Sequence, residues 1–566
     1  MTYTPPVADQ RFVLKHVVGI DELAGHNRFA EATPDLVDAI LEGAGQIAAG
    51  EFAPLNRTGD EVGAKWSPEA VTMPAGFREA YQAYVEGGWG TLAGPADHGG
   101  QGLPLILATV VMEDLGAANM AFSLVTMLSA GAVEALRHHG SPELQAQWLP
   151  KLVTGEWTRT MNLTEPQAGS DVGALKTRAE PVGDGSWRVS GQKIFITFGD
   201  HDLADNIVHL VLARTPDAPP GTKGISLFLV PKVLPDGRRN DLRCVSIEHK
   251  LGIHASPTCV MAFGDDGDCR GWLIGGELAG MRAMFTMMNN ARLNVGLQGV
   301  SIGERATQAA VAYAAQRVQG VRGGKPAAIV DHPDVRRMLL RMTALTQAAR
   351  ALCYYAAGQT DRGTLGDRAA QARADLLTPL VKAYGTDIGC EVASLGVQVH
   401  GGMGFVEETG AAQHYRDIRI SPIYEGTNGI QAADLVGRKI GLEGGETLRR
   451  LFADIRADAG EGPLAGLADV GESAAQRLIS MGADDRLAGS YPFLTLLSTL
   501  VCGWLMKRQL DALESPEIAE SRHFAAMKHA ACLYYLDHVV PEAAGLAAQA
   551  IAGASLFYPE DELFAT

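Results

Sequence analysis

The chain has 566 residues, of which 46% are apolar and 20% are charged, so it can bury sizeable cores and wholesale disorder is not expected. Acidic residues outnumber basic ones by 65 to 48, a net charge of −17. This balance argues against a general nucleic-acid binder, which needs a basic face to neutralise phosphates. No uninterrupted apolar stretch is long enough to span a bilayer, and no secretory signal is visible at the N-terminus.

Residues 1–160 are predicted to form a mainly helical domain. Apolar residues recur at helical spacing over 106–115 and 122–138, and glycine clusters separate such segments. The pattern changes near residue 160, and 161–278 is predicted to form a compact β domain. Its β-like runs, separated by turn residues, are 187–197, 206–213 and 225–230.

Long helices return after this β region. Residues 281–313, 335–357 and 369–395 are rich in Ala, Leu and Met, which predicts an antiparallel four-helix bundle over 279–440. A glycine-rich break then precedes an additional helical domain at 441–566, which contains 18 acidic and 9 basic residues. The predicted fold class is therefore mainly α with a central β domain.

The seven cysteines are spread along the chain and none form a CxxC pair. An odd number without paired spacing predicts neither a disulfide framework nor a zinc site. We expect most of them to be small core residues in a protein of the reducing cytoplasm. The chain also lacks a Gly-rich dinucleotide fingerprint, a Walker A loop and an HExxH helix, so no metal is predicted.

Three segments carry candidate chemistry. Residues 161–171 (MNLTEPQAGSD) combine a glycine with hydroxyl groups in a loop that can offer donors to an electron-rich ring or a phosphate. Residues 193–199 (KIFITFG) end a strand and present Phe195 for stacking and Thr197 as a hydroxyl. Taken singly, the first segment also suits an ordinary turn and the second a half-buried strand.

The third segment, residues 423–431 (IYEGTNGIQ), places a carboxylate in a Gly-containing loop beside an aromatic ring. Partial burial would raise the pKa of Glu425 and make it a better base near neutral pH. The alternative is a surface acid ahead of a helix N-cap, Thr427 or Asn428.

The order and spacing of these segments resemble the acyl-CoA dehydrogenase family over about residues 40–440. Further matches are 313–319 (YAAQRVQ) and 398–405 (QVHGGMGF). The resemblance implies a helical N-terminal domain, a middle β domain and a C-terminal four-helix bundle. The longer N-terminus and added C-terminal region are similar to the long-form subgroup that contains 3-methylmercaptopropionyl-CoA dehydrogenases.

The resemblance implies non-covalent FAD and a homodimer or dimer of dimers, because Arg317 and residues 398–402 match groups that bind the FAD of a neighbouring subunit. It implies that Glu425 is the catalytic base. The positions matching cofactor contacts are Met161, Leu163, Thr164, Gly169, Ser170, Phe195, Ile196, Thr197, Arg317, Gln398, Val399, His400, Gly401, Gly402, Thr427, Asn428 and Gly429. The positions matching substrate contacts are Ser170, Asn289, Arg292, Tyr424 and Gly426.

The implied reaction is α,β-dehydrogenation of an acyl-CoA thioester to a trans-2-enoyl-CoA. Glu425 removes the α-proton, the flavin accepts the β-hydride, and an electron-transfer flavoprotein accepts the electrons. Backbone and ribityl donors would stabilise the enolate oxygen as an oxyanion hole does. The first substrate hypothesis is 3-methylmercaptopropionyl-CoA or another short- or medium-chain acyl-CoA, and a long-chain acyl-CoA is the alternative.

The sequence differs from the family pattern at two places, and three alternative functions remain open. Residues 320–326 are longer than the usual family turn, which puts the role of His332 in doubt, and Gly429 replaces a larger polar residue of many relatives. The rivals are an acyl-CoA oxidase, a non-catalytic DNA-binding relative and a structural protein that retains only the fold. The acidic C-terminal region argues against the DNA-binding relative.

Overall fold

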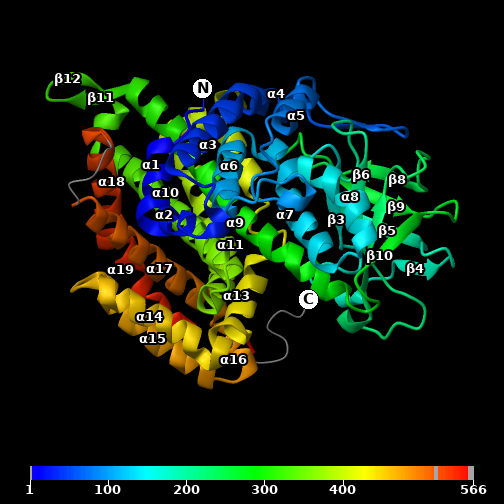
Figure 1. Cartoon of the computed structure of the whole chain (residues 1–566). Coiled ribbons are helices and arrows are strands. Elements are labelled where there is room, and N and C mark those ends of the chain that lie inside the picture. Colours follow the sequence, from blue (N-terminus) through cyan, green and yellow to red (C-terminus); the bar gives the residue numbers. More distant parts are fainter. Residues whose placement is uncertain (1–2, 515–520, 559–566) are drawn as a thin grey trace. The chain divides into compact units, whose positions relative to one another are not determined.

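The computed structural model describes residues 3–514 and 521–558 (Figure 1). The chain divides into two compact units. The β unit comprises Thr2–Pro5 and Gly43–Ala291, and the helical unit comprises Pro6–Glu42 and Arg292–Thr566. Two helices, α3 (Pro34–Ile47) and α9 (Gly280–Gln316), begin in one unit and end in the other.

Helices form the first part of the β unit. Helix α7 begins at the N-cap Asn119, whose side chain accepts a hydrogen bond from the Phe122 N–H at 3.1 Å. The helices are α4 (Ala53–Val62), α5 (Phe77–Glu86), α6 (Leu105–Ala118), α7 (Met120–His139) and α8 (Pro142–Thr154), with a short pair of strands, β1 (Lys65–Trp66) and β2 (Val71–Thr72).

An eight-stranded sheet forms the rest of this unit, in the order β3-β6-β7-β10-β5-β9-β8 with β4 paired to β5. Only β3 and β6 run parallel to each other. Strands β6 and β7 are buried at every position, which explains their continuous apolar runs. The strands are β3 (Thr158–Asn162), β4 (Arg178–Pro181), β5 (Trp187–Thr197), β6 (Ile207–Ala213), β7 (Ser226–Pro231), β8 (Leu242–Ile247), β9 (Thr258–Phe263) and β10 (Arg270–Ile274).

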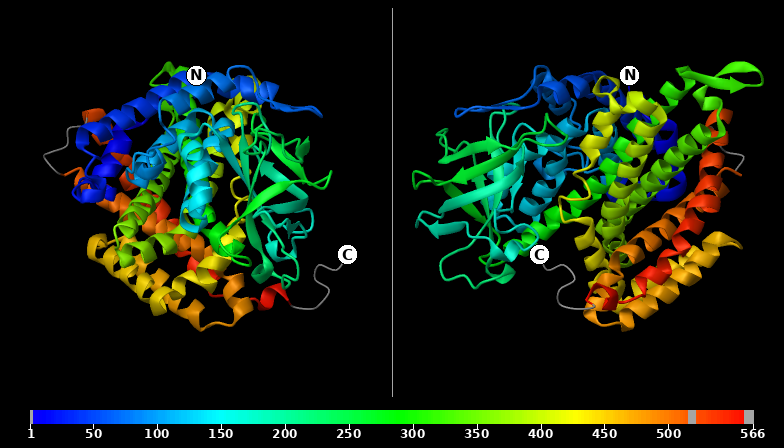
Figure 2. Two further views of the ribbon diagram at one scale, coloured as in Figure 1. Left: turned by 45° about the vertical axis from the view of Figure 1, so that its right-hand side comes forward. Right: turned by 180° about the vertical axis from the view of Figure 1, so that it is seen from behind.

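Long helices build the helical unit, and its C-terminal helices, orange to red in Figure 2, lie alongside them. The bundle helices are α9, α10 (Pro333–Thr364), α11 (Arg368–His400), α12 (Ala411–Ile418) and α13 (Asn428–Gly437), with a hairpin of β11 (Val318–Arg322) and β12 (Lys325–Ala328). The added helices are α14 (Glu446–Ala459), α15 (Pro463–Ser480), α16 (Ala483–Ala488), α17 (Ser490–Ala512), α18 (Arg522–Tyr534), a π-helix (Tyr535–Val539), α19 (Val540–Ala544) and α20 (Leu546–Ala550).

Glycines bring α9 and α11 into close contact. A Cβ atom on Gly299 would lie 1.8 Å from the carbonyl oxygen of Gly385, and one on Gly296 would lie 2.3 Å from that of Val381. No side chain fits at either position, so the two helices meet backbone to backbone. This contact fixes the spacing of the helices that carry Arg292 and Lys382.

A buried ion cluster ties the first helix to the last part of the chain. Asp9, on α1 (Val7–Val13), pairs with Arg350 on α10 at 2.5 Å and with Lys528 on α18. Arg350 also reaches Glu304 at 2.7 Å. Burial alone would raise the pKa of Asp9, but the charges of Lys528 and Arg350 outweigh it and lower that pKa.

The predicted fold class is confirmed, and the predicted strands and long helices match the observed ones closely, except that α10 continues to Thr364, beyond the predicted end at 357. All seven cysteines are free, and all but the half-buried Cys390 are buried. Within the described residues, one helix, α7, is long and apolar enough to cross a membrane by length and composition. However, 88% of its apolar window is buried inside the protein, which is the pattern of a core helix.

Candidate active site

A bulge on β5 turns an aromatic ring out of the sheet. The pairing of β5 with β9 shifts register between Lys193 and Ile196, and Phe195 within this bulge has φ 60°. Phe195 is 58% exposed, although it lies within a strand, near its end. The bulge therefore presents a flat ring face at the surface of the β unit, and its stacking on a flavin stays a prediction.

The neighbouring loop is anchored by a buried ion pair. The Lys193 ammonium donates to the Glu165 carboxylate at 2.8 Å and to the Leu163 carbonyl oxygen at 3.0 Å. Glu165 also accepts from the backbone and hydroxyl of Thr177 and from the Lys176 N–H. Burial alone would raise the Glu165 pKa, but Lys193 and these donors outweigh it and bring it to about 2. The pair therefore fixes the loop to β5.

The other predicted residues of the β unit differ in exposure. Gly169, Ser170 and Asn289 are exposed, so their groups are accessible on this unit. The remaining residues are the half-buried Leu163, Thr164 and Thr197 and the buried Met161 and Ile196. Because their side chains are buried, Met161 and Ile196 can offer a ligand only backbone atoms.

In the helical unit, Glu425 lies in a strained loop just before α13. Its backbone has φ 55°, a region that non-glycine residues rarely adopt, and its side chain is half-buried. Within the described residues, neither its carboxylate nor its backbone N–H has a hydrogen-bond partner inside the chain. The residue is thus held in place by the loop while its reactive groups stay uncommitted.

Burial raises the pKa of Glu425, and the positive charges of Arg292 and Lys382 partly oppose that rise. Arg292 is only 6% exposed, and its Nε atom has no hydrogen-bond partner. Burial lowers the Arg292 pKa, and no carboxylate of the described chain lies within ion-pair distance of it. A carboxylate and two buried cations therefore share one region without forming a close pair.

Two glutamines support the loop around the base. The Tyr424 hydroxyl donates to the Gln298 side-chain oxygen at 2.6 Å, and Ser421 donates to the same atom at 2.9 Å. Gly426 has φ 81°, and a Cβ atom there would lie 2.8 Å from the Gln431 amide nitrogen. The positive φ therefore favours glycine at this position, whereas the Gln431 amide ends a flexible side chain and could move aside.

The residues after the glycine begin α13. Thr427 is its N-cap and accepts a hydrogen bond from the Ile430 N–H at 3.1 Å, as the alternative interpretation of this segment expected. Asn428 is buried, and its side chain bonds to α11 groups through both its nitrogen and its oxygen. Gly429 is exposed, and a Cβ atom there would meet only the Thr427 hydroxyl, at 3.7 Å.

The predicted diphosphate and adenine residues lie at two helix ends. Arg317 follows α9, is exposed, and makes no ion pair with any described residue. At the end of α11, Gln398 is exposed and Val399 is buried, and a Cβ atom on Gly401 or Gly402 would meet nothing within 4 Å. His400 stacks on Tyr313 with ring centroids 4.4 Å apart, and its buried Nε2 atom has no partner.

Sequence reasoning missed three supporting residues: Lys193, Lys382 and Gln298. A signal was present for each lysine. Lys193 follows the inward alternation of its strand, and Lys382 interrupts a buried apolar stretch of α11. Gln298 carries no comparable signal, because its role depends on the loop that folds back onto α9.

The residues present fit a flavin dinucleotide. Each unit offers accessible groups suited to part of such a ligand. The β unit provides the uncovered Phe195 ring and the Ser170 and Thr197 hydroxyls. The helical unit provides the exposed Arg317 guanidinium and open glycine backbone at Gly401 and Gly402, which suit a diphosphate.

Comparisons with known proteins agree over most of the chain, from residue 38 to residue 558. Family models match in order: "Acyl-CoA dehydrogenase, N-terminal domain" at residues 38–156, the middle domain at 160–265, the C-terminal domain at 279–440, and "Acetyl-CoA dehydrogenase C-terminal like" at 452–558. The last of these matches the added helices.

Individual relatives agree with the family models. The chain is 47% identical to 3-methylmercaptopropionyl-CoA dehydrogenase of Ruegeria pomeroyi, over 91% of this chain and 92% of the relative. It is 39% identical to a butyryl-CoA dehydrogenase of Syntrophomonas wolfei, over 80% and 78% of the two chains. The fold matches an acyl-CoA dehydrogenase of Bacillus anthracis complexed with FAD with a TM-score of 0.75 and 21% identity, over 92% of this chain and 90% of that one. The chain therefore belongs to the acyl-CoA dehydrogenase family and is an FAD-dependent oxidoreductase that acts on acyl-CoA thioesters.

Proposed function

We propose that the chain oxidises a short acyl-CoA, 3-methylmercaptopropionyl-CoA in the first place, with Glu425 as the base and an electron-transfer flavoprotein as the electron acceptor. The observation that carries the proposal is the uncommitted, half-buried Glu425 carboxylate beside Arg292 and Lys382. A base with a raised pKa and no internal hydrogen-bond partner is poised to accept a substrate proton near neutral pH.

The backbone of the same residue can serve the substrate carbonyl. The Glu425 N–H donates to no acceptor within the described chain, so it is available to a thioester oxygen. As the α-proton leaves, negative charge develops on that oxygen, and a fixed donor stabilises it. FAD, when bound, supplies the acceptor for the β-hydride. The protein supplies the base, the donor and the exclusion of water.

A tightly packed interior lies next to the predicted substrate helix α9. Met127, Leu128, Met161 and Met287 line a space too tight for a water molecule. Met161 belongs to the predicted flavin segment, and Met287 lies two residues before Asn289. A Cβ atom on Gly131 would lie 2.9 Å from the Met287 carbonyl oxygen, so α7 and α9 pack closely at this point.

The 47% identical relative named for 3-methylmercaptopropionyl-CoA supports this particular thioester as the first candidate. The 39% identical butyryl-CoA dehydrogenase supports a short chain in general. Anaerobic titration of the purified flavoprotein with 3-methylmercaptopropionyl-, butyryl- and palmitoyl-CoA tests the point. Fast bleaching of the flavin band by the short thioesters is expected, and preferential bleaching by palmitoyl-CoA would overturn the chain-length proposal.

Replacing the base tests the mechanism. Glu425→Gln keeps the shape but cannot accept a proton, so the rate of flavin bleaching falls by about a hundred- to ten-thousandfold while FAD is retained. The matched control is Glu461→Gln, because the same change there alters an exposed acid far along the chain. Normal bleaching by Glu425→Gln would rule out this residue as the base.

The electron acceptor is tested separately. Reduced enzyme is mixed with an electron-transfer flavoprotein under anaerobic conditions and, in parallel, with oxygenated buffer. Fast reoxidation by the flavoprotein and slow reoxidation by oxygen are expected. The reverse order would make the chain an acyl-CoA oxidase.

The oligomeric part of the proposal is a homodimer, or a dimer of dimers, in the cytoplasm. It is supported by the unpaired Arg317 and by the exposed apolar residues beside the 398–402 segment, Met403 at 45% and Phe405 at 88%. Light scattering of the FAD-loaded protein tests it, and a monomer would contradict it.

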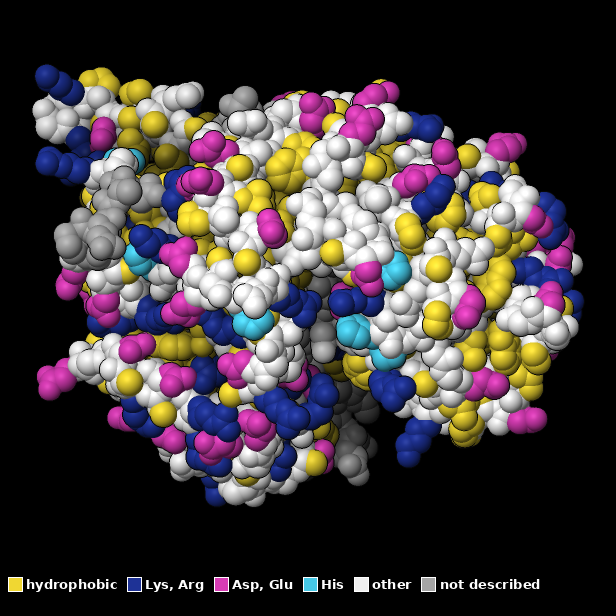
Figure 3. All heavy atoms as spheres, in the orientation of Figure 1, with side chains coloured by type: hydrophobic (Ala, Val, Ile, Leu, Met, Phe, Trp, Pro, Cys, Tyr) yellow, Lys and Arg dark blue, Asp and Glu magenta, His cyan; other side chains and the backbone are white. Residues whose placement is uncertain are grey.

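A DNA-binding role is less favoured. On the face shown in Figure 3, acidic and basic side chains are intermixed over α14 and α15, and the added region as a whole is acidic. A phosphate backbone is attracted by a continuous basic surface, which this mixture does not provide.

A further inference from the structure

Lys382 is a buried ammonium group that the proposed reaction does not use. It lies on α11 with its side chain fully buried. Its hydrogen-bond partner is the side-chain oxygen of Asn428, at 2.9 Å, and no described carboxylate lies within ion-pair distance of it. Burying an ammonium group with so few partners is costly, so the position calls for an explanation.

Asn428 links this lysine to an aspartate on the same helix. While its oxygen accepts from Lys382, its amide nitrogen donates to Asp387 at 2.9 Å. The same nitrogen also lies 3.1 Å from the Ala383 carbonyl oxygen and 3.0 Å from the Thr386 hydroxyl. These contacts hold the first residue of α13, and with it the Glu425 loop, against α11.

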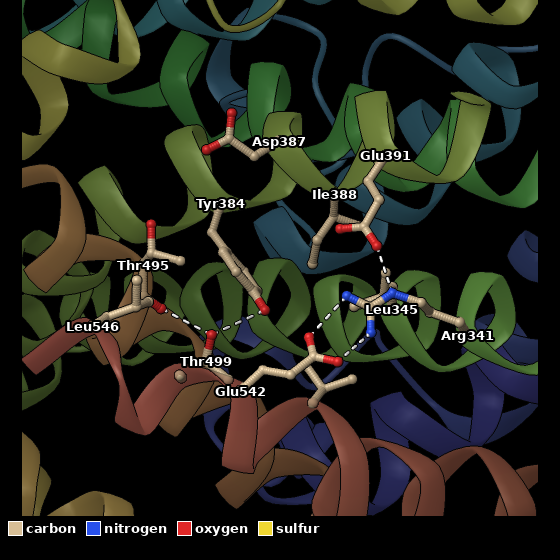
Figure 4. Close-up of a pocket in the computed structure, with 12 residues that line it drawn as sticks. Arg341, Leu345, Tyr384, Asp387, Ile388, Glu391, Thr495, Thr499, Glu542 and Leu546 are labelled. Atoms are coloured by element: carbon tan, nitrogen blue, oxygen red, sulfur yellow. Dashed lines mark hydrogen bonds and ion pairs between the residues drawn. The ribbon is translucent and has the colours of Figure 1, made fainter. Parts of the chain in front are cut away.

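The chain of contacts ends in the added C-terminal region. The Tyr491 hydroxyl, in the first turn of α17, donates to the second oxygen of Asp387 at 2.6 Å. Asp387 also lines a cavity of about 300 Å³ between α10, α11 and the added helices, where Figure 4 shows it on α11 near Tyr384. One tyrosine of the added region thus completes a series that runs Tyr491–Asp387–Asn428–Lys382.

The charges around this series depend on one another. Burial lowers the Lys382 pKa to about 7, Glu425 and Asp387 act to raise it, and Arg292 lowers it further. Burial raises the Asp387 pKa, which the Tyr491 and Asn428 hydrogen bonds and the charges of Lys382 and Arg419 oppose. Because the lysine titrates near neutrality, a change at Asp387 alters how much positive charge Glu425 meets.

We propose that Lys382 is a positioning residue for the catalytic base, and that Tyr491 of the added C-terminal region keeps it charged and in place through Asp387 and Asn428. The added region therefore has a defined part in the active site. Through Tyr491 it acts on Asp387, and thereby on the positive charge of Lys382 that lowers the pKa of Glu425. This inference rests on the proposed role of Glu425 but makes separate predictions.

The direct test measures the protonation of Glu425 without turnover. The infrared carboxyl band of Glu425 is isolated by subtracting the spectrum of the same protein carrying Glu425→Gln, and it is followed across pH. Lys382→Met removes the positive charge while conserving volume, so the Glu425 titration should move to higher pH by about one unit. Tyr491→Phe should move the Glu425 titration in the same direction but by less, because it removes only the hydrogen bond to Asp387 and leaves the Lys382 charge in place.

Tyr535→Phe is the matched control. The Tyr535 hydroxyl also links the added region to α11, through the Tyr384 hydroxyl at 2.8 Å, but it has no contact with Asp387 or Asn428. It should lower the thermal midpoint about as much as Tyr491→Phe and leave the Glu425 titration unchanged. If Lys382→Met does not fold, the two tyrosine variants still decide the question.

Kinetics give a second readout. For a bleaching substrate, the acidic limb of the pH profile should move with the infrared titration, so the rate at the low-pH end falls about tenfold in Lys382→Met. The plateau at high pH and KM should change little. An unshifted Glu425 titration in both Lys382→Met and Tyr491→Phe, or an equal shift in Tyr535→Phe, would overturn the inference. A wild-type protein that no acyl-CoA bleaches would instead contradict the proposed function, and the infrared result would still decide the inference.

Discussion

The two units treat a glutamate and a buried lysine in opposite ways. In the β unit, Lys193 and Glu165 meet at 2.8 Å, and the carboxylate collects further donors until its pKa falls to about 2. In the helical unit, Lys382 and Glu425 influence each other without a close ion pair, and burial raises the pKa of the glutamate. The first arrangement builds a scaffold, and the second leaves a base free to react.

The difference lies in the partners rather than in the residue types. A carboxylate that is saturated with donors stabilises the fold and cannot take up a proton near neutral pH. A buried carboxylate without hydrogen-bond donors lowers the stability of the fold, but its raised pKa makes it a better base near neutral pH. Removing single charges therefore has opposite consequences at the two sites.

The largest effect on stability is expected at the scaffold pair. Lys193→Met leaves the Glu165 charge buried without its cation, so the free energy of unfolding should fall by about 3–5 kcal/mol and the flavin should be lost with the loop. Thermal unfolding and the flavin-to-protein absorbance ratio measure both effects. The double variant Lys193→Met with Glu165→Gln removes both charges and should recover part of the stability. A single variant as stable as wild type would show that the pair does not hold the loop.

A smaller effect of opposite sign is expected at the base. The pKa of Glu425 in the folded protein lies above its unfolded value near 4.5. The stability that this residue contributes to the fold is therefore fully present below pH 4.5 and is lost as pH rises through the folded pKa. Glu425→Gln should therefore become progressively more stable than wild type from mildly acidic to neutral pH. Each tenfold difference in proton affinity is worth about 1.4 kcal/mol.

The thermal midpoints of wild type, Glu425→Gln and Glu461→Gln, compared across this pH range, measure the difference. Glu461 is exposed, so its variant should follow wild type throughout. A Glu425→Gln protein that loses stability relative to wild type as pH rises would mean that the carboxylate is satisfied in the fold.

The smallest effect is expected at the helix that follows the base. Thr427→Ala removes the N-cap bond to Ile430 and should cost about 1 kcal/mol of stability. Thr427→Ser keeps the hydroxyl and serves as the control. If Thr427 also contacts the flavin, as its sequence match predicts, the alanine variant should bind FAD more weakly as well. Unchanged FAD affinity would leave Thr427 as a cap alone.

Much of the fold could be predicted from the sequence because its elements are long and regular. The helices at 281–313 and 369–395 carry clear periodicity, and the buried strands β6 and β7 are continuous apolar runs. The bulge that turns Phe195 outward was not predictable, since it depends on the pairing of β5 with β9. The ending of α9 and the β11–β12 hairpin explain the longer segment after Arg317, where His332 bonds to the Gln319 carbonyl oxygen at 2.8 Å.

The candidate site was found through motifs that are local in sequence. Glu425, Gly426 and Thr427 are adjacent, so a short pattern reveals them. Lys382 and Tyr491 could not be found in this way, because they meet the motif only through Asn428 and Asp387. The bonded residues are 41 to 104 positions apart in the chain. Side chains that support a site from neighbouring helices leave no spacing rule in the sequence.

The cluster around Asp9 bears on how far the chain could be shortened at either end. One carboxylate near the start of the sequence balances a bundle arginine and a lysine of the late helix α18. Removing the first helix would leave the buried Lys528 without its carboxylate partner. Removing the last helices would expose the apolar side of the first helix. The two extensions beyond the three-domain core are thus linked through one buried ion cluster, so losing either one leaves a buried charge without an ionic partner.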